Sequence, residues 1–179
     1  MRRNTVYNDV IKTASRLFYK QGYNATGINQ IIDEGKISKA AMYANFSTKE
    51  DILKAYLEKT GVETNQALRD VADKHKSPRD KALAIFDFLR LLMQQKDYYG
   101  CNFLNIVSEI PVENDRIRAV IKAQKDGIRD LFKEILTPAK KERLADELYL
   151  RFEAALIGQK VHVDTWPVEK AKAMAAKLF

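Results

Sequence analysis

The chain has 179 residues, 46% of them hydrophobic, with only seven Gly and four Pro, which is typical of a globular protein built from helices. Its net charge of +7 favours an anionic partner, either nucleic acid or an anionic membrane surface. The excess of positive charge is concentrated near the N-terminus, where residues 1–60 contain ten Lys and Arg and six Asp and Glu. Cys101 is the single cysteine, which excludes an internal disulfide and a cysteine-based zinc cluster. No run reaches the roughly 18 apolar residues of a membrane span. We therefore expect a cytoplasmic protein without a membrane partner, metal or cofactor.

The first 46 residues carry the signals of three helices. Apolar residues recur at three- and four-residue spacing from about Asn4 to Gln21. Thr26 is predicted to cap a brief helix that Gly35 interrupts, and Ser38 to cap another that extends to about Asn45. Two short helices joined by a turn with a glycine, after a longer supporting helix, form the helix-turn-helix pattern.

The rest of the chain is predicted to be helical as well. Thr48 and Asp51 resemble a capping box that opens a long helix to about Lys74. Proline and glycine breaks then predict further helices that begin at Pro78, cover Asn102–Ile110, Glu113–Leu136 and Lys140–His162, and restart at Trp166. The sequence therefore predicts an all-α protein of nine helices.

Residues 26–53, TGINQIIDEGKISKAAMYANFSTKEDIL, resemble the DNA-binding motif of the TetR/AcrR family of transcriptional regulators. The family pattern runs from a Thr-capped helix through a small-residue turn and Val-Ser-Lys to Tyr-x-x-Phe and Ser-Lys-Glu-x-Leu. Lys36 stands where many relatives have Gly, and Asn45 replaces a frequent His. The resemblance covers about the first 55 residues. It implies a tri-helical helix-turn-helix DNA-binding domain at residues 1–48 and a helical-bundle ligand-binding and dimerisation domain at residues 49–179.

The predicted contacts with an operator in double-stranded DNA fall into two groups. Ser38 caps the helix whose start enters the major groove, Lys39 is a candidate for a guanine or a phosphate, and Ala40 and Ala41 allow a close approach and can contact a thymine methyl. Phosphate contacts are predicted from hydroxyls, amides and cations: Arg2, Arg3, Thr26, Tyr43, Asn45 and Lys49. The resemblance implies the same roles for Thr26, Tyr43 and Lys49.

The resemblance also implies a pocket for a small-molecule effector that releases a repressor from DNA, and the small and apolar residues of the last two helices predict a homodimer. Predicted ligand-binding residues are Phe86, Leu89, Tyr98, Tyr99, Asn102, Phe103, Ile106 and Glu109, for which an ordinary helical core with Glu109 in solvent is the alternative. A two-fold dimer with a near-palindromic operator is predicted to use the last two helices, through Leu144, Leu148, Phe152, Ala155, Leu156, Val163, Ala171, Ala175 and Leu178.

Two other classes of protein compete with a DNA-binding regulator. One is a helical ligand-binding protein without DNA binding, against which Lys39, Tyr43 and Lys49 argue. The other is an enzyme with Cys101 as nucleophile and His75 or His162 as base, which is disfavoured because nothing in the sequence brings these residues together and a lone cysteine is usually a small hydrophobe. An activator and a repressor use the same contacts, so the sequence does not separate them.

Overall fold

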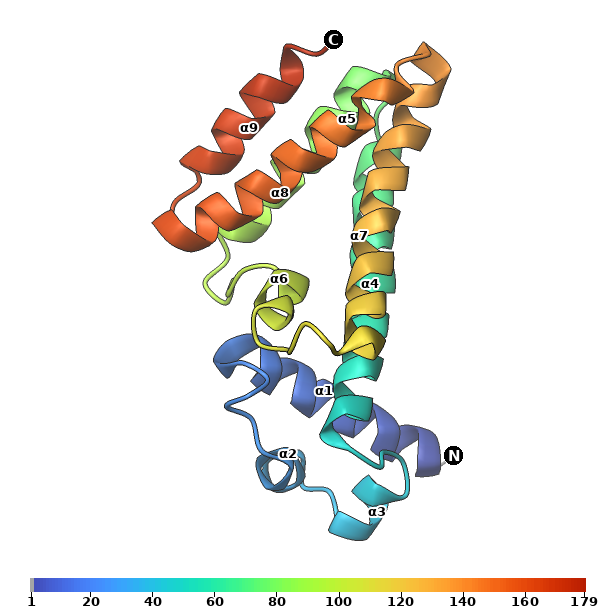
Figure 1. Cartoon of the computed structure of the whole chain (residues 1–179), viewed down its shortest axis with the longest axis vertical. Coiled ribbons are helices and arrows are strands. Elements are labelled where there is room, and N and C mark those ends of the chain that lie inside the picture. The colour runs from blue at the N-terminus through green and yellow to red at the C-terminus, as the bar shows by residue number, and fades with distance from the viewer. Residues whose placement is uncertain (1) are drawn as a thin grey trace. The chain divides into compact units, whose positions relative to one another are not determined.

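The computed structural model describes the backbone of residues 2–179 and the side chains of residues 5–179 (Figure 1). Within this range the chain forms nine α-helices, two 3-10 turns and no strand, which confirms the all-α prediction. None of the described helices is long and apolar enough to cross a lipid bilayer.

The helices gather into two compact units. Unit 1 holds the residues up to Gly61 together with Asn102–Ile121, and unit 2 holds Val62–Cys101 and Lys122–Phe179. Two helices, α4 (Lys49–Asp73) and α7 (Asp115–Leu136), contribute residues to both. The predicted boundary after residue 48 concerns function and stays a prediction, but the compact units do not follow it.

Unit 1 is built around α1 (Arg2–Gln21), against which α2 (Ile28–Gly35) and α3 (Lys39–Tyr43) pack (Figure 1). The apolar stripe of α1 is buried together with one face of each short helix because three- and four-residue spacing places these side chains on one side. The buried residues from these three helices and the turn between α2 and α3 are Val10, Ile11, Ala14, Leu17, Phe18, Ile31, Ile37 and Met42.

Two of the local signals predicted for unit 1, a glycine stop and a capping box, are present in the structure. Gly22 ends α1 with a φ of +96°, a conformation that a side chain rarely adopts. Thr48 and Asp51 form the predicted capping box, because the Asp51 N–H donates to Thr48 Oγ1 at 3.1 Å and the Thr48 N–H donates to Asp51 Oδ2 at 2.9 Å. Phe46 follows α3 and stacks on Tyr7 with ring centroids 4.9 Å apart.

Unit 2 contains α5 (Pro78–Met93), α8 (Ala145–His162) and α9 (Trp166–Ala176), with α9 lying along both α5 and α8 (Figure 1). Ser77 caps α5 by accepting the Asp80 N–H at 3.0 Å, and Pro78 occupies the first turn as predicted. The core of unit 2 contains a cluster of Phe86, Phe132 and Phe152, whose ring centroids lie 6.2 to 6.4 Å apart.

Three predicted boundaries differ from the structure. α6 covers Asn102–Val107 and stops before Ile110, and α7 starts at Asp115. α8 starts at Ala145 because two 3-10 turns, Thr137–Ala139 and Glu142–Leu144, precede it. Lys140 between them has a φ of 55°, which interrupts a right-handed helix.

Candidate nucleic-acid interface

The turn between α2 and α3 sets the direction of α3. Ile37 in the turn and Met42 in α3 are buried, so they anchor both ends of this segment in the core of unit 1. Ser38 is the predicted cap, and its Oγ accepts the Ala41 N–H at 3.1 Å. Because Met42 turns one side of this five-residue helix toward the core, the opposite side of α3 faces away from the core.

The outer face of α3 carries Lys39, Ala40 and Tyr43, all of them exposed. Tyr43 leaves 45% of its surface open to solvent, and Ala41 is half-buried. An exposed ammonium and an exposed phenol hydroxyl can reach phosphate oxygens or base edges, and the small Ala40 leaves room for a close approach. Asn45 donates from Nδ2 to Ala41 O at 2.8 Å and so closes the end of this helix.

Lys36 ends α2 in the left-handed conformation, with a φ of 52° and a ψ of 41°. A residue with a side chain costs about 1–2 kcal/mol in this region, which explains why glycine suits the position. The lysine is exposed in the turn that leads into α3. The sequence marked Lys36 as a departure from the family pattern, and the structure shows its conformational cost.

Replacing Lys36 with Gly is expected to raise the free energy of unfolding by up to about 1 kcal/mol, because relief of left-handed strain exceeds the entropy cost of the glycine. Lys140→Gly is a matched control, since Lys140 is also left-handed but lies in unit 2. Chemical denaturation measures both variants. A less stable Lys36→Gly protein contradicts the strain argument, and weaker duplex binding by this variant alone assigns a DNA contact to the lysine.

Thr26 differs from both of its predicted roles. α2 begins after Gly27 without a side-chain cap, so Thr26 is not the N-cap. Its side chain is fully buried, its hydroxyl donates to Gly22 O at 2.7 Å, and its N–H donates to Tyr23 O at 3.2 Å. Because both donors are used inside the turn, we assign Thr26 no phosphate contact.

Lys49 holds the same turn from the start of α4. Its Nζ donates to the carbonyl oxygens of Tyr23 and Thr26, each at 3.0 Å, and lies 4.1 Å from the centroid of the Tyr23 ring. Burial lowers the pKa of Lys49, and the negative charge of Glu109 opposes this shift. Two of the three ammonium donors are therefore used within the protein. The side chains of Arg2 and Arg3, also predicted to contact phosphates, lie outside the described residues.

The eight predicted ligand-binding residues are divided between the two units. Phe86 and Leu89 are buried in unit 2, where Tyr98 is half-buried and Tyr99 exposed. The other four belong to unit 1, in which Phe103 and Ile106 are buried, Asn102 accepts a hydrogen bond from the Tyr56 hydroxyl, and Glu109 contacts Asn24. Asn102 and Glu109 thus have partners within unit 1.

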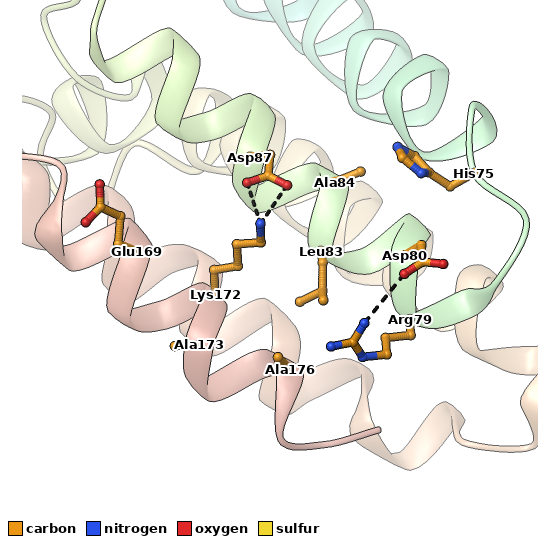
Figure 2. Close-up of a pocket in the computed structure, with 10 residues that line it drawn as sticks. All are labelled: His75, Arg79, Asp80, Leu83, Ala84, Asp87, Glu169, Lys172, Ala173 and Ala176. Carbon is orange, nitrogen blue, oxygen red and sulfur yellow. Dashed lines mark hydrogen bonds and ion pairs between the residues drawn. The ribbon is translucent and has the colours of Figure 1, made fainter.

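An open groove of about 460 Å³ lies elsewhere, between α5 and α9. Figure 2 shows Asp87 of α5 facing Lys172 of α9, whose Nζ donates to the two carboxylate oxygens at 2.6 and 2.7 Å. His75 and Arg79 also border the groove, and the eight predicted ligand residues do not line it. The ion pair thus occupies two of the polar side chains that line the groove.

α8 has apolar side chains on two opposite faces. Six of the nine residues predicted to meet a symmetry mate are buried within the protomer, so the prediction is wrong for them: Leu148, Phe152, Ala155, Leu156, Ala171 and Ala175. Leu144 and Leu178 are half-buried, and Val163 is 82% exposed. A second row at four-, three- and four-residue spacing is exposed instead, with Leu150 64%, Ile157 47% and Val161 69% open around the exposed Ala154. The neighbouring helix α9 also exposes apolar surface, with 50% of Trp166 and 44% of Met174 open to solvent.

The three residues of the enzyme alternative have different partners. Lys125 Nζ donates to Cys101 Sγ at 3.5 Å and pairs with Glu153 at 2.9 Å. The ring of His162 lies 4.9 Å from that of Trp166, and His75 borders the groove between α5 and α9. The contacts of Cys101 thus supply an ammonium and not the imidazole base that the alternative requires.

Comparisons with known proteins agree with this geometry. Residues 10–56 match the profile described as bacterial regulatory proteins, tetR family. The chain is 30% identical over 124 residues to the HTH-type transcriptional activator FasR of Mycolicibacterium smegmatis, a match that covers 66% of this chain and 54% of FasR. It is 28% identical over 118 residues to an uncharacterized HTH-type transcriptional regulator of Lactococcus lactis, covering 65% and 60%. The chain thus spans little more than half the length of these curated relatives.

Solved structures share the fold over nearly the whole chain. The reduced form of NemR from E. coli superposes with a TM-score of 0.87 at 19% identity, over 96% of this chain and 95% of NemR. A TetR transcriptional regulator from Chloroflexus aurantiacus gives 0.86 at 22% identity, over 99% and 96%. The helix-turn-helix of α2 and α3 lies inside the segment of residues 10–56 that matches the tetR family of bacterial regulatory proteins.

Proposed function

We propose that the protein is a cytoplasmic repressor that binds a near-palindromic DNA operator as a homodimer and is released by a small-molecule effector. The outer face of α3 carries this proposal, because Lys39, Ala40 and Tyr43 are exposed on a helix whose inner face is anchored by Met42. The net charge of +7 supports an anionic partner. A two-fold dimer presents α3 twice, which calls for two half-sites about one helical turn apart.

Binding to random duplex DNA at increasing salt tests this proposal. We expect binding at low salt whose logarithm falls linearly with the logarithm of the salt concentration, because phosphate contacts release counterions. Selection from a random pool is then expected to recover an inverted repeat. Failure to bind any duplex, with the protein folded, favours the helical ligand-binding protein without DNA binding.

The homodimer rests on the second apolar row of α8 and on α9. A helix that is apolar on opposite faces needs cover on both sides, and unit 2 covers only one. The exposed row of Leu150, Ala154, Ile157 and Val161 runs along α8, and α9 adds the exposed side chains of Trp166 and Met174. A second copy of this surface supplies the missing cover in a two-fold interface.

Release by an effector and the repressor mode are proposed from the family resemblance. α4 contributes residues to both units, so it offers a continuous element for coupling an effector site to α3. An effector shifts DNA binding only by its differential affinity for the two states. A thermal-shift screen of small apolar compounds, followed by duplex binding and a transcription reporter, tests both points. The relative FasR is named an activator, and increased transcription in the reporter would assign that mode here.

A further inference from the structure

The turn at residues 22–26, which precedes α2, forms hydrogen bonds with the segment 102–121. Glu109, which follows α6, accepts the Asn24 N–H on Oε2 at 2.8 Å. In the reverse direction, Asn24 Nδ2 donates to the Glu109 carbonyl oxygen at 3.0 Å. Both residues belong to unit 1, so this pair is part of one compact body with α2 and α3.

The local geometry leaves little freedom at this contact. A Cβ placed on Gly22 would lie 3.0 Å from Glu109 Oε1, so the carboxylate rests directly against the glycine that ends α1. Lys49 binds the same turn, because its Nζ donates to the carbonyl oxygens of Tyr23 and Thr26. A carboxylate that binds an N–H and an ammonium that binds two carbonyls have complementary roles, because together they satisfy backbone groups of opposite polarity.

Three further contacts hold the two ends of the segment 102–121 to the rest of unit 1. The Tyr56 hydroxyl of α4 donates to Asn102 Oδ1 at the start of α6. At the other end, Asn114 Nδ2 donates to Glu50 Oε2 at 2.8 Å, and Arg116 pairs with Asp51 at 2.6 Å. Glu109 lies between these two ends of the segment, and it contacts the turn before α2.

We infer that Glu109 is a positioning residue for DNA binding. It fixes the conformation of the turn at residues 22–26 and thereby the position of α2, the helix that precedes α3. The inference rests on the proposed function. It assigns Glu109 to the support of the DNA-binding helices, where the sequence had predicted contact with a ligand. If α6 moves, Glu109 moves with it and shifts the turn before α2, so this route of coupling does not require a movement of α4. Loss of the carboxylate therefore weakens DNA binding although Glu109 touches no DNA.

The test compares Glu109→Ala with Glu113→Ala. Glu113 is an exposed carboxylate in the same connection, so both substitutions change the net charge equally. Glu109→Ala is expected to raise the Kd for a duplex about tenfold relative to Glu113→Ala, since a charge-assisted hydrogen bond is lost. Glu109→Gln keeps an oxygen acceptor for the Asn24 N–H and is expected to bind within about threefold of the wild type. The active fraction, measured by stoichiometric titration, stays complete if the role is positioning and falls if it is only folding.

Hydrogen exchange without DNA gives a second measurement that does not depend on the proposed function. In Glu109→Ala, amides at residues 22–27 and in α2 are expected to exchange about tenfold faster, and those of α8 and α9 at the wild-type rate. If Glu109→Ala fails to fold, Asn24→Ala tests the reverse hydrogen bond from an exposed position, because it removes the Nδ2 donor to the Glu109 carbonyl oxygen and keeps the N–H on the carboxylate; faster exchange in the turn is expected there too. Unchanged exchange in the turn, or equal Kd values for the two alanine variants, overturns the inference. Faster exchange in a protein whose wild type binds no duplex supports Glu109 as the residue that holds the turn and rejects the DNA-binding proposal alone.

Discussion

Replacing Lys39 with Ala is expected to weaken operator binding roughly 10- to 100-fold and to relax the preference at one base position, while Tyr43→Ala weakens binding to every duplex alike. The difference follows from chemistry, since a lysine at the start of α3 can reach a base edge and a phenol hydroxyl serves a phosphate. Both side chains are exposed, so neither loss removes core packing.

The measurement is a duplex-binding titration with the selected operator and with random DNA. Lys76→Ala is the control, because it removes an exposed cation from the turn between α4 and α5 in unit 2. General charge loss lowers all affinities similarly, whereas a contact made by α3 distinguishes Lys39 from Lys76. Unchanged affinity in the Tyr43→Ala protein contradicts its phosphate role, and equal effects of the two lysine substitutions contradict a special role for Lys39.

Replacing Ile157 with Glu is expected to convert the homodimer into monomers and raise the dimer dissociation constant roughly a thousandfold, because the symmetry buries the new charge twice. Ile157 is 47% exposed in the middle of the second apolar row of α8, so the folded protomer tolerates the carboxylate. Sedimentation at micromolar concentration measures the effect, and duplex binding is expected to fall with it since one protomer presents only one α3.

Leu91→Glu is the matched control for this experiment. Leu91 lies on α5, exposes 55% of its surface and stands outside the α8 row, so its replacement should leave the dimer intact. A dimer that persists in Ile157→Glu would place the interface on another surface. Dissociation of both variants would point to a general effect of added negative charge.

The helices and the helix-turn-helix followed from local rules that a single sequence displays. Caps such as Ser38 and the Thr48–Asp51 box act within four residues, and apolar spacing acts within a few turns. The exposed face of α3 was predictable for the same reason, because burying Met42 leaves Lys39 and Tyr43 on other sides of a short helix.

The faces of α8 were not predictable in this way. Its apolar residues fall in two rows, and either row satisfies the helical spacing. The protomer core takes the row with Phe152, because Phe86 and Phe132 approach from α5 and α7. Which row a helix turns inward depends on neighbours that are distant in sequence. The second row is nevertheless visible in the sequence as a spacing of four, three and four residues.

By itself the sequence determined the helical elements, their caps and the family motif that places Lys39 and Tyr43 on the outer face of α3, because these depend on interactions between near neighbours. Only the tertiary structure decided that Thr26 is buried, that Asn102–Ile121 joins the unit of the helix-turn-helix, and that Glu109 contacts Asn24. Eighty-five positions separate that last pair. Contacts over such distances depend on how whole helices pack, and helical periodicity does not specify which polar side chain meets which turn.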